Sequence, residues 1–391
     1  AGVDIVDTAF GAMAGLTSQP SLNSLYYALQ GNARLFKGNI DDYDALSRYW
    51  EVVREYYQPF ESGMKAPNAE VYKYEMPGGQ YTNLKQQAQA VGLGERWEEV
   101  KDMYRRVNLL FGDIVKVTPS SKVVGDMALF MVQNRLTEDD IYERGETLDF
   151  PDSVVSFFKG AIGVPYQGFP KELQRIVLKG HPPIEGRPGE HLQPVDFEEL
   201  RKSLEQKIGR KPSDRDVLSY VMYPKVFLEF NERLEKYGKM SVLDTPTFFY
   251  GLRLGEEVQV EIERGKTLIV KLVSIGQLQK DGTRIVYFEL NGQPREVVIR
   301  DRSADVSVEA KRKANRDNPN EIGATMPGAV VKVLVKEGEK VKKGDQLLVT
   351  EAMKMETTVQ APVSGVVEEV HVKEGDAIQT GDLLLVLRPQ K

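Results

Sequence analysis

The sequence contains no cysteine and only three histidines among its 391 residues. Without cysteine, disulfides, thiolate catalysis and cysteine-ligated metals are all excluded. His181 and His191 lie in one Pro/Gly-rich loop, and His371 lies alone in a β-rich stretch. Neither arrangement has the ligand spacing of a metal site. We therefore expect no metal to be bound by these residues.

The sequence also lacks an excess of positive charge and any long apolar run. The formal net charge is −6, so no phosphate-binding surface and no nucleic-acid partner is expected. No segment approaches the roughly 18 unbroken apolar residues that a membrane span needs, so no membrane partner is expected. The chain opens without methionine, and we expect it to begin inside a domain, so targeting is not inferred from it; a cytoplasmic location is expected if the source is bacterial.

A repeat with an offset of 37 residues occupies the end of the chain. It aligns Gly328 with Gly365, Gly338 with Gly375, Gly344 with Gly381 and Asp345 with Asp382. Each half consists of short Val/Leu-rich segments separated by Gly-Asp and Glu-Gly turns, and is too small to bury its apolar face alone. We expect the two halves to close on each other as one small β-sandwich.

The junction between the two halves places one lysine between two methionines. The segment reads Glu-Ala-Met-Lys-Met-Glu-Thr over residues 351–357, which puts Lys354 at the tip of a predicted tight hairpin. The simplest alternative is a solvated turn lysine between two adaptable apolar side chains. The order Glu-Ala-Met-Lys-Met-Glu, however, resembles the attachment site of biotin carboxyl carrier domains over residues 322–391. The resemblance implies covalent biotin on Lys354; lipoyl domains are similar in fold but usually lack both methionines.

Residues 22–238 have an almost entirely helical pattern. One apolar stripe contains Trp97, Val100, Tyr104, Val107 and Phe111 at spacings of three and four, which predicts a core-facing helix. Ser213 with Asp216 and Thr137 with Asp140 form capping-box pairs, Pro170 fits a first turn, and Gly180, Gly209 and Gly238 fit helix ends. Ahead of this region, Val3 and Ile5 are expected in a buried strand that runs into a Gly/Ala-rich loop, as in a late βα unit of a (β/α)₈ barrel.

One segment inside the helical region is chemically distinctive. An extended apolar stretch around Val115 and Val117 is followed by Thr-Pro-Ser-Ser-Lys over residues 118–122, and a helix is predicted to begin there. The hydroxyls of Thr118, Ser120 and Ser121 and the ammonium of Lys122 would gather at the helix N-terminus, which favours an anion. An N-cap serine next to an exposed lysine would give the same pattern.

The periodicity changes from helical to alternating after residue 246. Four strands are predicted at 258–263, 267–273, 284–290 and 296–300, with Arg-Gly, Asp-Gly and Asn-Gly turns between them. Residues 303–320 carry mixed charge and little apolar content, so we expect a flexible tether that lets the carrier visit more than one site.

Several motifs in the first 240 residues resemble the carboxyltransferase domain of the pyruvate carboxylase family. They are Tyr-Trp-Glu at 49–51, Phe-Glu-Ser-Gly-Met at 60–64, Glu-Met-Pro-Gly-Gly-Gln-Tyr-Thr-Asn-Leu at 75–84 and Val-Thr-Pro-Ser-Ser-Lys at 117–122. The resemblance implies that Thr118 shuttles a proton between pyruvate and biotin, and that Ser121 and Lys122 line the biotin pocket. Pyruvate and oxaloacetate would then be the substrates.

The same resemblance implies a multidomain α and β protein with four parts. Residues 1–240 would end a (β/α)₈ barrel and its helical extension, 241–302 would form part of a tetramerisation or allosteric β-domain, 303–320 the linker, and 321–391 a pseudo-twofold flattened β-barrel or sandwich carrier. It also implies a biotin protein ligase, a homotetramer and acetyl-CoA as partners. ATP with magnesium and a divalent metal of the barrel are expected in the whole enzyme, but not on these residues.

Two other interpretations remain. One is another biotin enzyme of the oxaloacetate decarboxylase or transcarboxylase group, which shares the barrel and the carrier. Lys122, the mixed-charge linker and the four predicted strands favour pyruvate carboxylase over that group. The other is a non-catalytic carrier and assembly module, against which the polar cluster at 118–122 argues.

Overall fold

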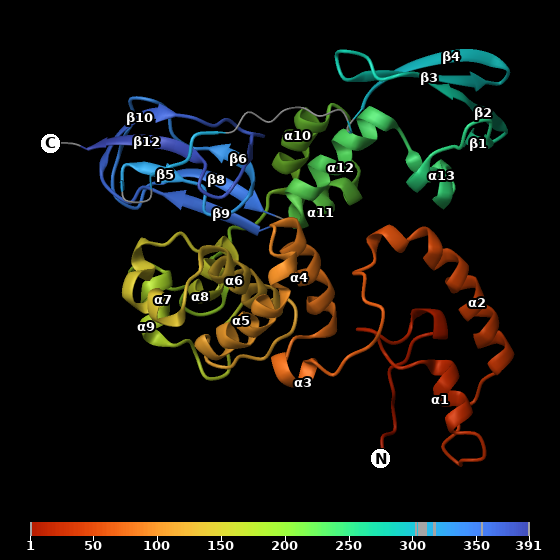
Figure 1. The fold of residues 1–391 in the computed structure, drawn as a ribbon, viewed down its shortest axis with the longest axis horizontal. Helices are drawn as coiled ribbons and strands as arrows, with labels where there is room; N and C mark the ends of the chain where they lie inside the picture. The colour runs from red at the N-terminus through yellow and green to blue at the C-terminus, as the bar shows by residue number, and fades with distance from the viewer. Residues whose placement is uncertain (1, 302, 304–310, 316–317, 353–354, 390–391) are drawn as a thin grey trace. The chain divides into compact units, whose positions relative to one another are not determined.

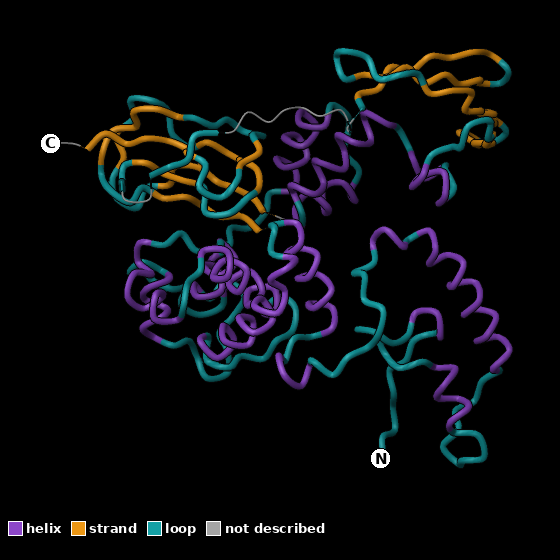
Figure 2. The backbone as a smooth tube through the Cα atoms, viewed as in Figure 1, coloured by secondary structure: helices purple, strands orange, loops and turns teal. Residues whose placement is uncertain are grey.

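The computed structural model describes residues 2–301, 303, 311–315, 318–352 and 355–389. It divides the chain into two compact units, one made of residues 1–192 with 310–391 and the other of residues 193–309. Figures 1 and 2 show helices in the first 250 residues and strands after them. Each unit is described separately below.

The first unit begins with a helical segment. Its helices are α1 (Leu22–Ala28), α2 (Ile40–Tyr56), α3 (Val71–Tyr74), α4 (Gly78–Ala90), α5 (Trp97–Leu110), α6 (Ser120–Asn134), α7 (Glu138–Arg144), α8 (Asp152–Lys159) and α9 (Lys171–Val177). Short 3₁₀ turns lie at Gly11–Met13, Gln58–Phe60, Gly94–Arg96, Gly145–Thr147 and Pro188–His191. The Thr137 side chain and Asp140 cap α7 reciprocally, which confirms that capping box.

The core of this segment lies around α5 and α6. The apolar stripe predicted from the sequence is buried on α5, with Tyr104, Val107 and Phe111 fully inaccessible. Helix α6 is buried from Val123 to Val132 on every side, because α4, α5 and α8 all pack against it. A helix enclosed in this way fixes the position of its own N-terminus, where the predicted polar cluster begins.

The buried strand predicted around Val3 and Ile5 is not formed. Val3 is 59% and Ile5 84% exposed, and the only β-contact among the described residues before 257 is a bridge between Ala9 and Ser21. A barrel strand requires hydrogen-bonded neighbours on both sides, and the described chain supplies none here. The segment around Val115 and Val117 is likewise extended but unpaired, and both side chains are exposed.

The first unit continues with the carrier, which contains two four-stranded sheets with a shared apolar core. Their orders are β5-β12-β10-β7 and β11-β6-β8-β9. The strands are β5 (Glu321–Gly323), β6 (Gly328–Val333), β7 (Lys340–Val341), β8 (Gln346–Ala352), β9 (Met355–Gln360), β10 (Gly365–Val370), β11 (Ala377–Ile378) and β12 (Leu383–Pro389). Strand β9 is at the edge of its sheet.

The glycines of the 37-residue repeat serve matching roles in both halves. Gly338 and Gly375 have φ of 84° and 87°, and Gly344 and Gly381 have φ of 91° and 81°, a region that favours glycine. Gly328 and Gly365 instead lie against backbone carbonyls of the neighbouring strand, at Glu351 and Arg388. Asp345 and Asp382 each accept a hydrogen bond from the backbone N–H three residues earlier. Equivalent residues of the two halves therefore adopt the same backbone geometry at their turns and close strand contacts.

Part of the predicted tether is attached to the carrier. Residues 304–310 and 316–317 lie outside the described residues, but Lys313 Nζ is 2.7 Å from Asp382 Oδ1 and Lys311 Nζ is 3.3 Å from Asp376 Oδ2. The backbone of Ala314 also donates to the carbonyl of Gly381. Lys311 and Lys313, whose charges contributed to the prediction of a flexible tether, instead pair with acidic side chains of the carrier. Residues 311–315 are therefore not a free linker.

The second unit combines helices with a β-meander. The helices are α10 (Phe197–Ile208), α11 (Asp214–Met222), α12 (Pro224–Tyr237) and α13 (Thr245–Tyr250), with a 3₁₀ turn at Met240–Val242. The strands β1 (Glu257–Glu263), β2 (Lys266–Ile275), β3 (Thr283–Leu290) and β4 (Gln293–Arg300) pair antiparallel in chain order. The four predicted strands are thus formed, and Ser213 with Asp216 makes the predicted capping box of α11.

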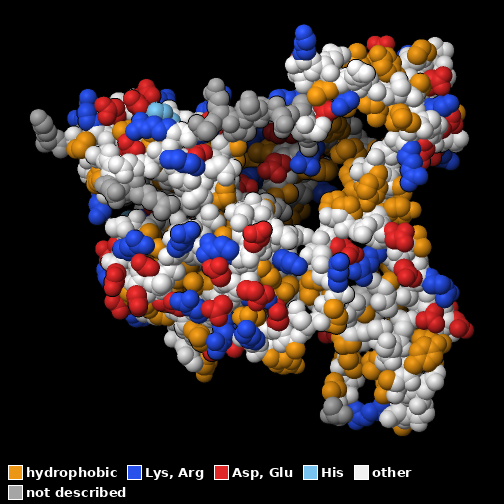
Figure 3. All heavy atoms as spheres, in the orientation of Figure 1, with side chains coloured by type: hydrophobic (Ala, Val, Ile, Leu, Met, Phe, Trp, Pro, Cys, Tyr) orange, Lys and Arg blue, Asp and Glu red, His pale blue; other side chains and the backbone are white. Residues whose placement is uncertain are grey.

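The visible surface of the helical region carries acidic and basic side chains in close alternation (Figure 3). Such mixing fits the modest net charge of the sequence. Among the described residues, no helix combines the length and apolarity needed to cross a bilayer.

Candidate functional site

The polar cluster predicted at residues 118–122 lies at the start of α6. The helix begins at Ser120 with Pro119 as its N-cap, and no side chain caps it. The hydroxyl of Ser120 instead accepts from the backbone N–H of Val117 at 3.1 Å and lies 2.6 Å from the Val117 carbonyl oxygen. Ser120 therefore stabilises the loop before the helix, while the first N–H groups of α6 are hydrogen-bonded to backbone carbonyls, that of Ser121 to Val117 and that of Lys122 to Pro119.

The other three members of the cluster differ in their exposure. Thr118 is exposed, the Lys122 side chain is 40% exposed, and Ser121 is buried beneath the phenol of Tyr104. Burial raises the pKa of Tyr104 well above its ordinary value, so its hydroxyl stays protonated. The structure thus brings the predicted residues to one helix end, with Thr118 and Lys122 accessible and Ser121 facing the core.

Asp126 is a functional candidate that sequence reasoning missed. Its carboxylate is 1% exposed and pairs through Oδ2 with the Lys122 ammonium, while Ser153 Oγ donates to the same oxygen at 2.6 Å. Burial raises the pKa of Asp126, and the adjacent Lys122 ammonium and Ser153 hydroxyl oppose that rise. The signal in the sequence was the four-residue spacing of Lys122 and Asp126, which places the two on one helix face.

Lys354, the predicted attachment residue, lies outside the described residues together with Met353. The strands on either side are described: β8 and β9 pair as far as Ala352 and Met355. Both of these residues are buried, and with Met326 they belong to the same apolar cluster as the α6 side chains Val123 and Met127. The carrier strands that lead to residues 353 and 354 therefore pack against the helical segment.

The edge strand β9 is hydrogen-bonded to the start of α8. Asp152, the first residue of α8, accepts from the Thr358 backbone N–H at 3.1 Å and from the Thr358 hydroxyl at 3.0 Å. Asp149 accepts from the Gln360 backbone N–H at 3.3 Å. Two carboxylates thus satisfy the N–H groups that an edge strand would otherwise leave unpaired.

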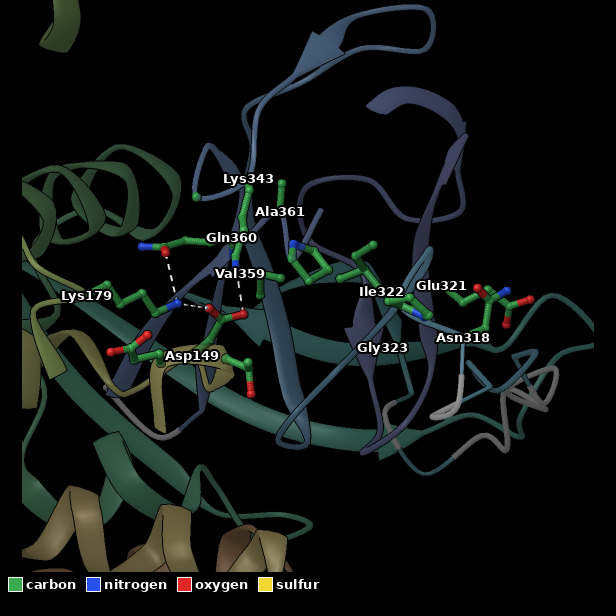
Figure 4. Close-up of a pocket in the computed structure, with 15 residues that line it drawn as sticks. Asp149, Lys179, Asn318, Glu321, Ile322, Gly323, Lys343, Val359, Gln360 and Ala361 are labelled. Atoms are coloured by element: carbon green, nitrogen blue, oxygen red, sulfur yellow. Dashed lines mark hydrogen bonds and ion pairs between the residues drawn. The ribbon is translucent and has the colours of Figure 1, made fainter. Parts of the chain in front are cut away.

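Lys179 completes this contact from the end of α9. Its ammonium is 3.2 Å from Asp149 Oδ1 and 3.0 Å from the Gln360 side-chain oxygen. Figure 4 shows both contacts among the residues that line a pocket, to which Lys343 and Ala361 also belong. Burial raises the pKa of Asp149, and the Lys179 ammonium and the Gln360 N–H act against that rise. A second contact joins Gln133 Nε2 to Thr380 Oγ1 at 3.0 Å.

Within the described parts of the chain, no group of three or more acidic, histidine or cysteine side chains is arranged to hold a metal ion. The chemistry available at the start of α6 is therefore that of hydroxyls, one half-exposed ammonium and one buried carboxylate. These groups can bind an anion or carbonyl oxygen and exchange a proton.

Comparison with known proteins identifies both regions that meet at this contact. Residues 71–271 match the family model described as a conserved carboxylase domain, which is more than half of the chain. The chain belongs to the conserved carboxylase domain family. Residues 320–387 match the model described as a biotin-requiring enzyme.

Curated relatives of this carboxylase family are pyruvate carboxylases. That of Bacillus subtilis (strain 168) is 63% identical over 364 residues, which cover 93% of this chain and 32% of the relative. Pyruvate carboxylase 1 of Caenorhabditis elegans is 48% identical over 366 residues, covering 93% of this chain and 31% of the relative. The chain spans about a third of the length of these relatives. The predicted resemblance to the C-terminal portion of pyruvate carboxylase is confirmed.

Solved structures agree. The carboxyl transferase domain of Rhizobium etli pyruvate carboxylase is 49% identical, with a TM-score of 0.70, over 77% of this chain and 51% of that chain. A complete multifunctional pyruvate carboxylase from the same organism is 46% identical, with a TM-score of 0.68, over 98% of this chain and 35% of that one. The mixed fold of helices and antiparallel sheets is therefore that of a part of pyruvate carboxylase.

Proposed function

We propose that this chain is the carboxyl-transfer and carrier part of a biotin-dependent pyruvate carboxylase that forms oxaloacetate from pyruvate. One observation carries the proposal: a biotin-requiring carrier lies in the same chain as a carboxylase region, and its strand β9 is hydrogen-bonded to helix α8 of that region. This contact supports delivery of the carried group to that region.

Lys354 is the proposed attachment residue for biotin. The pairing of β8 with β9 up to Ala352 and Met355 supports this role, because these two paired strands flank Lys354 in the sequence. Biotin, when bound, supplies a ring nitrogen that carries a transferable carboxyl group. Its attachment requires a biotin protein ligase as a partner.

Thr118 is the proposed proton shuttle between pyruvate and the biotin ring nitrogen. Its side chain is accessible at the start of α6, and positioned proton transfer typically contributes about 10² to 10⁴ in rate. Ser121 and Lys122 are proposed to line the biotin pocket. The partly exposed side chain of Lys122 fits that role directly, whereas Ser121 is buried.

The proposed domain boundaries remain 1–240, 241–302, 303–320 and 321–391, with residues 311–315 held on the carrier as described above. The barrel of which residues 1–240 would form the end, and a flattened pseudo-twofold carrier, are part of the proposal. So are the ATP, magnesium and barrel-metal sites elsewhere in the complete enzyme, the homotetramer and the response to acetyl-CoA.

An avidin gel shift tests the carrier role. The chain is co-expressed with a biotin protein ligase beside Lys354→Arg, and Lys343→Arg serves as a control at another carrier lysine. We expect a shift in the unaltered chain and in Lys343→Arg, and none in Lys354→Arg. No shift in the unaltered chain would indicate a lipoyl-type or unmodified carrier and remove the main support for carboxyl transfer.

A further inference from the structure

Lys122 occupies a position that is unfavourable for a lysine. It lies in the first turn of α6, where the positive end of the helix dipole disfavours a cation. Its ammonium is nevertheless held in place by Asp126, one turn further along the same helix. A lysine ammonium has three donors, and Asp126 is its one acceptor among the described residues. The remaining donors are available to a ligand on the exposed side.

Asp126 is equally unusual for a partner in a helix ion pair. Pairs with four-residue spacing normally lie on the surface with both charges solvated, whereas the Asp126 side chain is 1% exposed. Its Oδ1 has no hydrogen-bond partner within the described chain. Burying a carboxylate with one unsatisfied oxygen costs stability, so a purely structural role does not explain the arrangement.

Ser153 connects this pair to the carrier contact. Its hydroxyl donates to Asp126 Oδ2 at 2.6 Å from the first turn of α8. The preceding residue, Asp152, accepts both hydrogen bonds from Thr358 of β9. The first turn of α8 therefore contacts both the Asp126 carboxylate, which holds Lys122, and strand β9, which follows the proposed attachment residue in the sequence.

We propose that Asp126 is a positioning residue. It holds the Lys122 ammonium at the N-terminal end of α6, so that the free donors of this ammonium contact the biotin-borne group when β9 contacts α8. This inference rests on the proposed function, because it assigns Asp126 a part in the same transfer. Asp126 does not touch the substrate, and its effect is exerted entirely through Lys122, with Ser153 fixing the orientation of its carboxylate.

The test is a double-mutant cycle in the complete carboxylase. Asp126→Asn keeps the size of the side chain and removes its charge, and Lys122→Met removes the ammonium. We expect Asp126→Asn to lower the turnover of pyruvate carboxylation roughly tenfold, as loss of one charge-assisted hydrogen bond would. The KM for pyruvate and bicarbonate-dependent ATP cleavage should stay within about twofold. Adding Asp126→Asn to Lys122→Met should cause no further loss, because residues that act as a unit are not additive.

Glu99→Gln is the matched control, because Glu99 forms an exposed ion pair with Arg96 on α5. Its turnover should equal that of the unaltered enzyme. Unchanged turnover in Asp126→Asn, or a multiplicative loss in the double variant, would overturn the inference. If the unaltered enzyme carboxylates no pyruvate, the proposed function itself has failed, and the two failures are thereby distinguished.

A second variant keeps the test decisive if Asp126→Asn does not fold. Ser153→Ala leaves both charges in place and removes one hydrogen bond to the carboxylate. We expect turnover to fall about threefold with the KM for pyruvate unchanged. Turnover equal to that of the unaltered enzyme would then contradict the positioning role.

Discussion

Thr358 donates both its backbone N–H and its hydroxyl to the carboxylate of Asp152, across 206 residues of sequence. Each oxygen of Asp152 receives one donor, at 3.1 and 3.0 Å. The same carboxylate begins helix α8, where a negative charge also interacts favourably with the helix dipole. Asp152 thus contributes to a helix start and to a domain contact at once.

Asp152→Ala should release β9 from α8. It removes two hydrogen bonds to a charged acceptor, with a loss of about 1 to 3 kcal/mol in the free energy of the contact. Hydrogen exchange of the Thr358 and Gln360 amides should accelerate about tenfold or more, while amides in the centre of β12 keep their protection. Asp139→Ala, an exposed acidic residue in the first turn of α7, is the control. Unaltered exchange at Thr358 would show that Asp152 does not hold the strand.

Thr118→Ala should separate the two half-reactions of the complete enzyme. If Thr118 passes the proton, oxaloacetate formation falls by about 10² or more, while biotin-dependent ATP cleavage continues. Ser120→Ala is a suitable comparison, because its hydroxyl bonds only to the backbone of the preceding loop. Normal oxaloacetate formation by Thr118→Ala would exclude the proton role.

Gly328→Ala should destabilise the carrier. A Cβ at this position would collide with the carbonyl oxygen of Glu351 on the paired strand, so β6 and β8 would have to separate. We expect a loss of about 1 to 3 kcal/mol in the free energy of unfolding, the usual cost of overpacking. The equivalent Gly365→Ala should behave alike, because its added Cβ would lie 2.6 Å from the Arg388 carbonyl oxygen, whereas a Cβ at Gly79 on α4 meets nothing within 4 Å. Thermal unfolding followed by circular dichroism measures the difference, and equal melting of all three variants would contradict the repeat's packing role.

The β-meander should lose stability in acid through Asp301. Hydrogen bonds from Arg284 and Ser303 lower the pKa of this carboxyl to about 2, below the value of about 3.9 for an unfolded chain. Its contribution to stability is therefore complete above about pH 4 and is lost as the pH falls through about 2. Denaturant unfolding of Asp301→Asn and the unaltered chain should differ at pH 5 and converge near pH 2. A difference that persists at pH 2 would mean that another group is responsible.

Local patterns allowed much of the structure to be predicted. The meander, both capping boxes and the apolar stripe of α5 depend on residues near each other in sequence, and all are formed. The predicted strand at Val3 and Ile5 failed for the opposite reason. A strand is stable only with neighbours, and apolar alternation says nothing about whether those neighbours are present.

The candidate site divides in the same way. Thr118, Ser121 and Lys122 could be proposed from the sequence because their motif is contiguous. The carrier contact was not, because it joins Asp149 and Asp152 to residues more than 200 positions away through ordinary side chains. Asp126 could have been found from its spacing to Lys122, but its burial depends on α8, which only the fold brings near.

The carboxylates that contact β9 also limit the pairing of this edge strand with other strands. Asp149 and Asp152 accept from the strand but cannot donate to it, so they end the sheet where another strand would extend it. Side chains of the same protein thereby occupy an edge that could otherwise pair with foreign strands.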